Sequence, residues 1–162
     1  MPVDTRDFKQ ALAKYITGVT VVTTADGAGR RWGFTASSFS SVSLDPPQIL
    51  VCIARTAHCY PAFMSSDGFA VNVLTGTQEN VARRFAQHDV DKFAGLPFGA
   101  GERDLPILQD ALAVFQCATR ARFPAGDHTI LLGEVLQARV GQGDPALYYD
   151  RQFRAADWHG RC

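Results

Sequence analysis

The densest group of chemically useful side chains lies between Gly33 and Pro47. Six hydroxyl side chains fall within the nine residues from Thr35 to Ser43. Hydroxyls both donate and accept hydrogen bonds, small side chains let a ligand approach the backbone amides, and the prolines after Asp45 stiffen the exit. Such a surface suits a polar heterocycle with a phosphorylated tail. The same composition also fits an exposed strand edge, and the residues alone leave both interpretations open.

Arg55 and Thr56 form a second candidate site, because they follow an apolar run and precede a short helical pattern through Tyr60 and Phe63. Amide groups at a helix N-terminus with an arginine beside them can bind a phosphate. An ordinary capped helix with a solvated arginine is the alternative. Arg84, which follows another arginine, is a weaker candidate for an anion contact.

His128 starts a strand-like run beside a tight turn, a position where most histidines are surface residues. The chain has no GxSxG, HExxH, P-loop or GxGxxG motif, and its four histidines lack the spacing of a catalytic zinc site. A phosphate-binding cleft without an obvious acid, base or nucleophile fits a cofactor that carries its own chemistry. Hydride transfer to a flavin needs positioning more than a side-chain proton donor. We therefore expect no catalytic side chain and no metal.

Strand patterns dominate the elements that must position these residues, and their order argues for a mostly antiparallel barrel with a few short helices around it. The length of 162 residues predicts a single domain over 1–162. An irregular, glycine-containing stretch from Asp91 to Pro106 predicts a long ordered loop or lid. Helices are predicted over about 5–15, through 60–63 and over 77–85 with Thr77 as N-cap, and strands over 19–24, from about 32, 49–54, 69–74, 112–123, 128–140 and 147–153.

Composition and charge exclude several classes of partner. Lys plus Arg equals Asp plus Glu at 16 each, so no net field favours nucleic acid or an anionic membrane. No apolar stretch approaches the roughly 20 residues that span a bilayer, and Asp4 and Asp7 stand where a signal peptide would be apolar, which predicts a cytoplasmic protein. Four cysteines without CxxC spacing are expected to be reduced thiols: Cys52, Cys59, Cys117 and Cys162.

Four segments, in order along most of the chain, resemble the short-chain flavin reductases of two-component monooxygenases. They are TGVTVVTT at 17–24, GFTASSFSSVSLDPP at 33–47, FAVNVL at 69–74 and GDHTI at 126–130. The resemblance implies an FMN-binding split β-barrel, usually a homodimer with the flavin near the subunit interface. It also implies an NADH- or NADPH-dependent enzyme that reduces FMN or FAD by hydride transfer and supplies a partner flavin-dependent oxygenase.

By the same resemblance, Thr35 to Ser38 would line the flavin ring and ribityl chain, and Ser41 to Ser43 would continue that wall. Cys52 to Thr56 would hold the phosphate end, and His128 would meet the nicotinamide nucleotide. A non-catalytic flavin-binding or storage protein on the same fold is the alternative, whereas the GDHTI segment does not support an oxidase of the pyridoxamine phosphate type. The predicted cofactor-binding residues are Thr35, Ala36, Ser37, Ser38, Ser41, Val42, Ser43, Cys52, Ile53, Ala54, Arg55, Thr56, Arg84, His128 and Tyr149.

Overall fold

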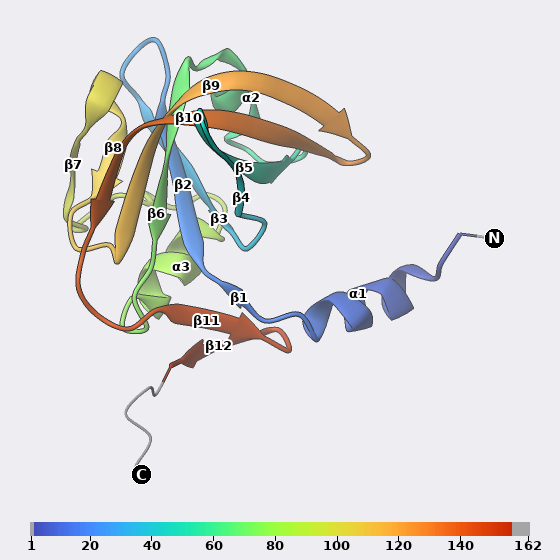
Figure 1. Ribbon diagram of the computed structural model, residues 1–162. Coiled ribbons are helices and arrows are strands. Elements are labelled where there is room, and N and C mark those ends of the chain that lie inside the picture. Colours follow the sequence, from blue (N-terminus) through green and yellow to red (C-terminus); the bar gives the residue numbers. More distant parts are fainter. Residues whose placement is uncertain (1, 157–162) are drawn as a thin grey trace.

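A seven-stranded antiparallel sheet forms the body of the protein in the computed structural model, which describes residues 2–156 (Figure 1). The strands lie in the order β3-β2-β6-β9-β10-β5-β4. The predicted mostly β fold with few helices is therefore confirmed. The bounds are β2 Thr20–Ala25, β3 Arg31–Ala36, β4 Ser40–Leu44, β5 Pro47–Ala54, β6 Gly68–Val73, β9 Ala113–Ala125 and β10 His128–Val140.

The sheet curls toward a barrel but does not close. Its two outer strands, β3 and β4, do not pair with each other in the described part of the chain. Only residues 37–39 connect them, and four Cα–Cα steps from Ala36 to Ser40 span at most about 15 Å. Because so short a link joins opposite edges of the sheet, these edges must lie near each other. The hydroxyl-rich segment therefore crosses the slit of a split barrel.

In the described part of the chain, two smaller sheets accompany the main one. One contains β1 Thr17–Gly18, β11 Ala146–Tyr149 and β12 Gln152–Ala155, and the other pairs β7 Phe98–Ala100 with β8 Pro106–Leu108. The single strand predicted over 147–153 is wrong, because Asp150 and Arg151 adopt positive φ of 49° and 62° and turn the chain into a hairpin. The predicted loop from Asp91 to Pro106 contains β7 and a short 3-10 helix, η1 Glu102–Asp104.

Residues 2–156 also form three α-helices: α1 Thr5–Ala13, α2 Tyr60–Ser65 and α3 Glu79–Phe85. The Asp4 carboxylate caps α1 by accepting the Arg6 N–H at 2.7 Å. The N-cap of α3 is Gln78 rather than the predicted Thr77, and its side-chain oxygen accepts the Thr75 N–H at 2.9 Å. No helix among residues 2–156 has the length and apolar character needed to cross a membrane.

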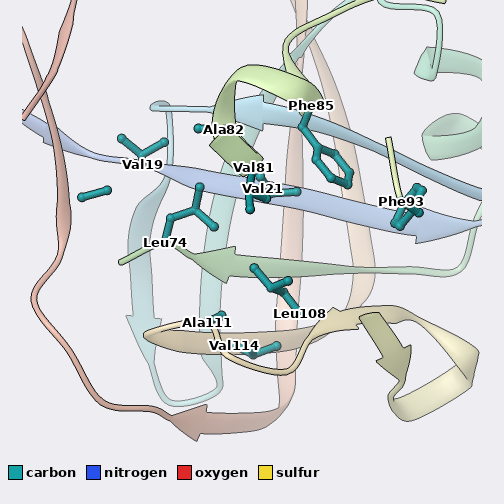
Figure 2. Close-up of a cluster of buried hydrophobic side chains, with 11 residues drawn as sticks. Val19, Val21, Leu74, Val81, Ala82, Phe85, Phe93, Leu108, Ala111 and Val114 are labelled. Atoms are coloured by element: carbon teal, nitrogen blue, oxygen red, sulfur yellow. The ribbon is translucent and has the colours of Figure 1, made fainter. Parts of the chain in front are cut away.

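Among residues 2–156, buried hydrophobic side chains form two clusters. Strand β2 lies between them, and its successive side chains point alternately into one cluster and the other. Val21 belongs to the cluster that includes α3, and Val22 to the cluster that includes Phe63 of α2. Figure 2 shows the first cluster, in which Phe85 of α3 and Phe93 lie close together, with ring centroids 5.0 Å apart. This packing fixes the end of α3 and the start of the following loop against the sheet.

Three of the predicted reduced thiols are seen as free cysteines. Cys59 and Cys117 are buried and Cys52 is half-buried. Burial raises the pKa of the Cys59 thiol, and raises that of Cys117 to about 12, so neither is activated as a nucleophile. Cys162, like His159, lies outside the described residues.

Candidate functional site

A cleft of about 690 Å³ lies beside the slit of the sheet, a size typical of small-molecule sites, which measure about 300–1,000 Å³. It is bounded by the end of β3 and the link that follows, by the end of β5, by the end of α3, and by the start of β10. The fold thus brings together three predicted groups that are distant in sequence. The predicted residues that line the cleft are Thr35, Ala36, Ser37, Ser38, Cys52, Ala54, Thr56 and His128.

The hydroxyls of the cleft divide into two kinds. Thr35 donates to the Ala82 carbonyl at 2.6 Å, and the Ser38 hydroxyl accepts the Cys52 N–H at 3.0 Å. Thr35 therefore holds β3 against α3, and Ser38 holds the link that follows β3 against β5. Within residues 2–156, the hydroxyls of Ser37 and Thr56 make no hydrogen bond to a protein group, which leaves them available to a ligand.

Lys92 supplies the positive charge of the cleft. Its ammonium donates to the carbonyl oxygens of Gly33 at 3.1 Å and Phe85 at 2.9 Å. An ammonium has three N–H donors, so one remains for a ligand. Desolvation lowers the pKa of Lys92 from its ordinary value, and none of the ion pairs among residues 2–156 includes it. A half-buried cation that lacks a carboxylate partner is well suited to hold a phosphate.

His128 stands at the rim of the cleft with one ring nitrogen already engaged. Its Nδ1 lies 2.7 Å from the Asp127 carboxylate, and this hydrogen bond is the main cause that lowers the pKa of Asp127. An ionised carboxylate only accepts, so Nδ1 carries the proton and, in the neutral ring, Nε2 is an acceptor. The turn is docked on β5, because the Arg55 N–H donates to the Asp127 carbonyl at 2.9 Å.

The wall between these polar groups is aromatic. Phe34 lines the cleft and is fixed by an edge-to-face contact with Phe63 at a centroid distance of 5.2 Å, whereas the Phe85 ring is 1% exposed and packs in the core behind it. A flat apolar surface beside hydroxyl and amide groups matches a heterocycle that has an apolar ring system and a polar edge.

Several predicted site residues lie elsewhere. The Ile53 side chain is 0% exposed and packs in the core, so only the backbone of this residue is placed to contact a cofactor. Ser41, Val42 and Ser43 lie on β4, the edge strand next to β5, and are outside the cleft lining. The remaining residues outside the lining are Arg55, which is exposed, Arg84, whose guanidinium donates to the Ala94 carbonyl, and Tyr149 on β11.

Lys92, His58, Gln87 and His88 line the cleft but were not among the predicted residues. The sequence marks Lys92 only weakly. It is a charged residue directly before the buried Phe93, at the start of an irregular segment. The two histidines carry no motif, and they reach the cleft because His58 directly precedes α2 and His88 follows the end of α3. The residues 2–156 contain no group of three His, Cys, Asp or Glu placed to hold a metal ion.

The donor set fits a phosphorylated heterocyclic cofactor. Free hydroxyls, one unpaired ammonium and an aromatic wall can bind and orient such a molecule. The cleft places no acid, base and nucleophile in the hydrogen-bonded arrangement of a hydrolase, within the part of the chain that is described. Its chemistry therefore depends on what the cleft binds.

Comparisons with known proteins agree with this chemistry. Residues 12–157 match the family model described as flavin reductase like domain. An NADH:riboflavin 5'-phosphate oxidoreductase from Streptomyces pristinaespiralis is 44% identical over 91% of this chain and 86% of its own length. An actinorhodin polyketide dimerase from Streptomyces coelicolor is 47% identical over 96% of this chain and 88% of its own length.

A solved structure of similar fold is the Streptomyces globisporus NADH:FAD oxidoreductase SgcE6 in complex with NAD and FAD fragments. It has a TM-score of 0.90 and 36% sequence identity, and covers 99% of both chains. Other relatives are named as reductase subunits of flavin-dependent monooxygenases, among them one from Rhodococcus jostii that is 36% identical over 93% of this chain and 77% of its own length.

Proposed function

Because the chain belongs to the flavin reductase-like domain family, we propose that it is an oxidoreductase that uses NADH to reduce a flavin bound in the cleft. Its relatives are flavin reductases and reductase components of flavin-dependent monooxygenases. They favour reduction of the flavin over the alternative of non-catalytic storage. The observation that carries the proposal is a cleft that holds free hydroxyls and an unpaired cation, at the place where the family's motif crosses the slit.

The flavin supplies the ring that accepts a hydride from the nicotinamide, and the protein supplies binding and orientation. Ser37 and Thr56 donate to the polar edge of the flavin or to its ribityl chain, since their hydroxyls are otherwise unused. Lys92 holds the phosphate through its third N–H. Phe34 keeps water from the ring face.

His128 orients the nicotinamide in this proposal. With Nδ1 held by Asp127, Nε2 accepts a hydrogen bond from the carboxamide of the nicotinamide. The role of the Arg55 side chain as the phosphate ligand is less well supported, because this side chain is exposed and lies outside the lining of the cleft. We therefore assign the phosphate to Lys92. From the predicted group Cys52 to Thr56, we retain Thr56 as a residue that contacts the flavin.

Assembly and partners are part of the proposal. Helix α1 has no buried residue, and Figure 1 shows it projecting from the body of the protein. Phe8, Leu12 and Tyr15 are 51%, 54% and 73% exposed, and a nine-residue helix is marginal in water without packing. We propose that a second copy covers this apolar face in a homodimer. A flavin-dependent oxygenase component would receive the reduced flavin, as the names of relatives suggest.

We further propose that the chain acts in the cytoplasm as one domain over 1–162. The three free cysteines fit a reducing compartment. We also propose NADPH as a second hydride donor beside NADH.

The test is to mix the purified protein with FMN or FAD and with NADH or NADPH in turn, and to follow nicotinamide absorbance. We expect rapid consumption in at least one combination that contains NADH. Tight flavin binding without consumption in any of the four combinations would instead support the storage function.

A further inference from the structure

A hydrogen bond between two hydroxyl groups lies next to the cleft, directly beside His128. The Tyr60 Oη is 2.9 Å from the Thr129 Oγ1. Tyr60 is the first residue of α2, and Thr129 follows His128 on β10. Neither side chain lines the cleft, and the proposed reaction uses neither of them.

The hydroxyl pair connects two sides of the cleft. The segment that leads from β5 into α2 carries Thr56, and two backbone turns make it compact. The Ala57 N–H donates to the Ala54 carbonyl at 3.0 Å, and the Tyr60 N–H donates to the Ala57 carbonyl at 2.9 Å. Because Tyr60 in turn bonds to the start of β10, the segment proposed to contact the flavin is tied to the strand that carries His128.

Stability alone does not explain this hydrogen bond. Thr129 is 2% exposed and Tyr60 is half-buried, and within residues 2–156 the Thr129 hydroxyl has no other hydrogen-bond partner. Burial of a hydroxyl costs free energy that the hydrogen bond offsets, and replacement of both partners by apolar groups of similar shape is nearly neutral. What an apolar pair does not supply is a directional contact that fixes the two segments relative to each other.

A second contact holds the hairpin of β9 and β10 on α2, but it lies farther from His128. The Arg122 guanidinium of β9 donates to the Phe63 carbonyl of α2 at 3.2 Å. Arg122 pairs with Leu131, which is farther along β10 than Thr129. Loss of the hydroxyl pair therefore leaves the hairpin attached to α2 and releases the position of its end next to His128.

We propose that Tyr60 and Thr129 are positioning residues, whose hydrogen bond sets His128, and through it the nicotinamide, relative to the flavin. The inference rests on the proposed function for the identity of the two ligands. A small displacement of His128 moves the Nε2 acceptor and with it the nicotinamide. Hydride transfer depends steeply on the distance and alignment of the two rings, so such a displacement lowers the rate.

The experiment compares the parent protein with the double variant Tyr60→Phe/Thr129→Val, which removes both hydroxyls and keeps the apolar bulk. Thr75→Val/Thr77→Val is the matched control. It removes another pair of hydroxyls, 3.0 Å apart in the connection before α3 and outside the cleft lining. Steady-state kinetics gives the Michaelis constant for NADH, fluorescence titration gives the Kd for FMN, and thermal denaturation gives the Tm.

The double variant should raise the Michaelis constant for NADH about three- to fivefold and leave the Kd for FMN within about twofold of the parent. Its Tm should stay close to that of the parent. Thr129→Ser keeps the hydroxyl and should show the Michaelis constant of the parent, as should the control.

A double-mutant cycle separates positioning from a general loss of structure. If the hydroxyl pair acts through His128, Tyr60→Phe/Thr129→Val should raise the Michaelis constant no further in a His128→Ala protein. The same fold-change with and without His128 overturns the inference, and so does a double variant with the Michaelis constant of the parent. Should the double variant not fold, Thr129→Val against Thr129→Ser makes the same comparison.

The proposed function fails separately, through a parent protein that binds NAD⁺ but does not oxidise NADH with either flavin. Titration calorimetry of the FMN-loaded protein with NAD⁺ does not depend on turnover. In that case the same loss of affinity in the double variant supports the positioning role, and an unchanged affinity overturns it.

Discussion

Lys92 is the residue that most directly tests how the cleft holds a phosphate. Substitution by methionine keeps the length of the side chain and removes its charge. A hydrogen bond to a charged group contributes about 1.5–3 kcal/mol, and because Lys92 is only half-buried we expect the lower end, about a tenfold weaker Kd for FMN. Fluorescence titration measures this Kd.

Arg55→Ala is the matched comparison for Lys92→Met. The Arg55 side chain is exposed outside the cleft, so this variant should bind FMN within about twofold of the parent. If Arg55→Ala instead lost affinity for FMN and Lys92→Met did not, the phosphate would be bound by the residues predicted from the sequence, Cys52 to Thr56.

The affinity for FMN should also depend on pH through Lys92. Its pKa is lowered by desolvation, so the charge is lost at a lower pH than the ordinary 10.5. The phosphate needs the charged form, and affinity therefore falls as the pH rises through the lowered pKa. The difference in pH profile between the parent and Lys92→Met isolates this contribution. Parallel profiles would show that Lys92 does not contact the phosphate.

His128→Ala should separate the two ligands. The free hydroxyls of Ser37 and Thr56 are untouched, so flavin titration should match that of the parent. Loss of the acceptor at Nε2 should raise the Michaelis constant for NADH about tenfold, the equivalent of one hydrogen bond. Steady-state kinetics with each donor measures this constant. Values equal to those of the parent would leave His128 as a surface residue held by Asp127.

At the scale of elements, β9 and β10 form the longest hairpin of the sheet, and its register shifts between Leu132 and Gly133. A Cβ added at Gly133 would lie 2.6 Å from the Phe69 ring and 2.8 Å from the Cys117 Cβ. The absence of a side chain therefore lets Phe69 pack over the strand. Because β10 also begins with His128, this packing supports the position of the site.

Gly133→Ala should lower the free energy of unfolding by about 1–3 kcal/mol, the range for an overpacked core. Thermal denaturation gives the corresponding decrease in Tm. Gly27→Ala is the control, since an added Cβ there meets no atom within 4 Å. Equal Tm values for the two variants would mean that the sheet accommodates the added methyl group at Gly133 without a loss of stability.

At the scale of the whole molecule, the exposed face of α1 is the feature that the monomer leaves unexplained. Leu12→Asp places a charge in that face, and we expect it to convert the proposed dimer to a monomer in light scattering at micromolar concentration. Val140→Asp is the control, because Val140 is 86% exposed at the end of β10 and lies outside α1. A parent protein of monomer mass that still reduces flavin would contradict the proposed assembly.

The sequence by itself determined the elements and the family. The β-branched run from Val19 to Thr24, the helix that begins at Thr5 and the free cysteines follow from local patterns that the structure retains. The hydroxyl-rich segment also indicated the site, because few structural roles need so many small polar residues in succession. Two predictions were wrong where contacts with the rest of the chain override the local sequence preference. The strand predicted over 147–153 is broken by a turn at Asp150 and Arg151, and the N-cap of α3 is Gln78 instead of Thr77.

Only the tertiary structure decided which of the predicted side chains share a cleft. Ile53 and Cys52 are adjacent in sequence, yet a strand points successive side chains to opposite faces, so one enters the core and the other the cleft. Lys92 gave no sequence signal because its role depends on two carbonyl oxygens, from Gly33 and Phe85, that only the folded chain brings to it. A local sequence pattern predicts which face of a strand is buried. It does not predict which backbone segment, distant in sequence, lies beside a given side chain.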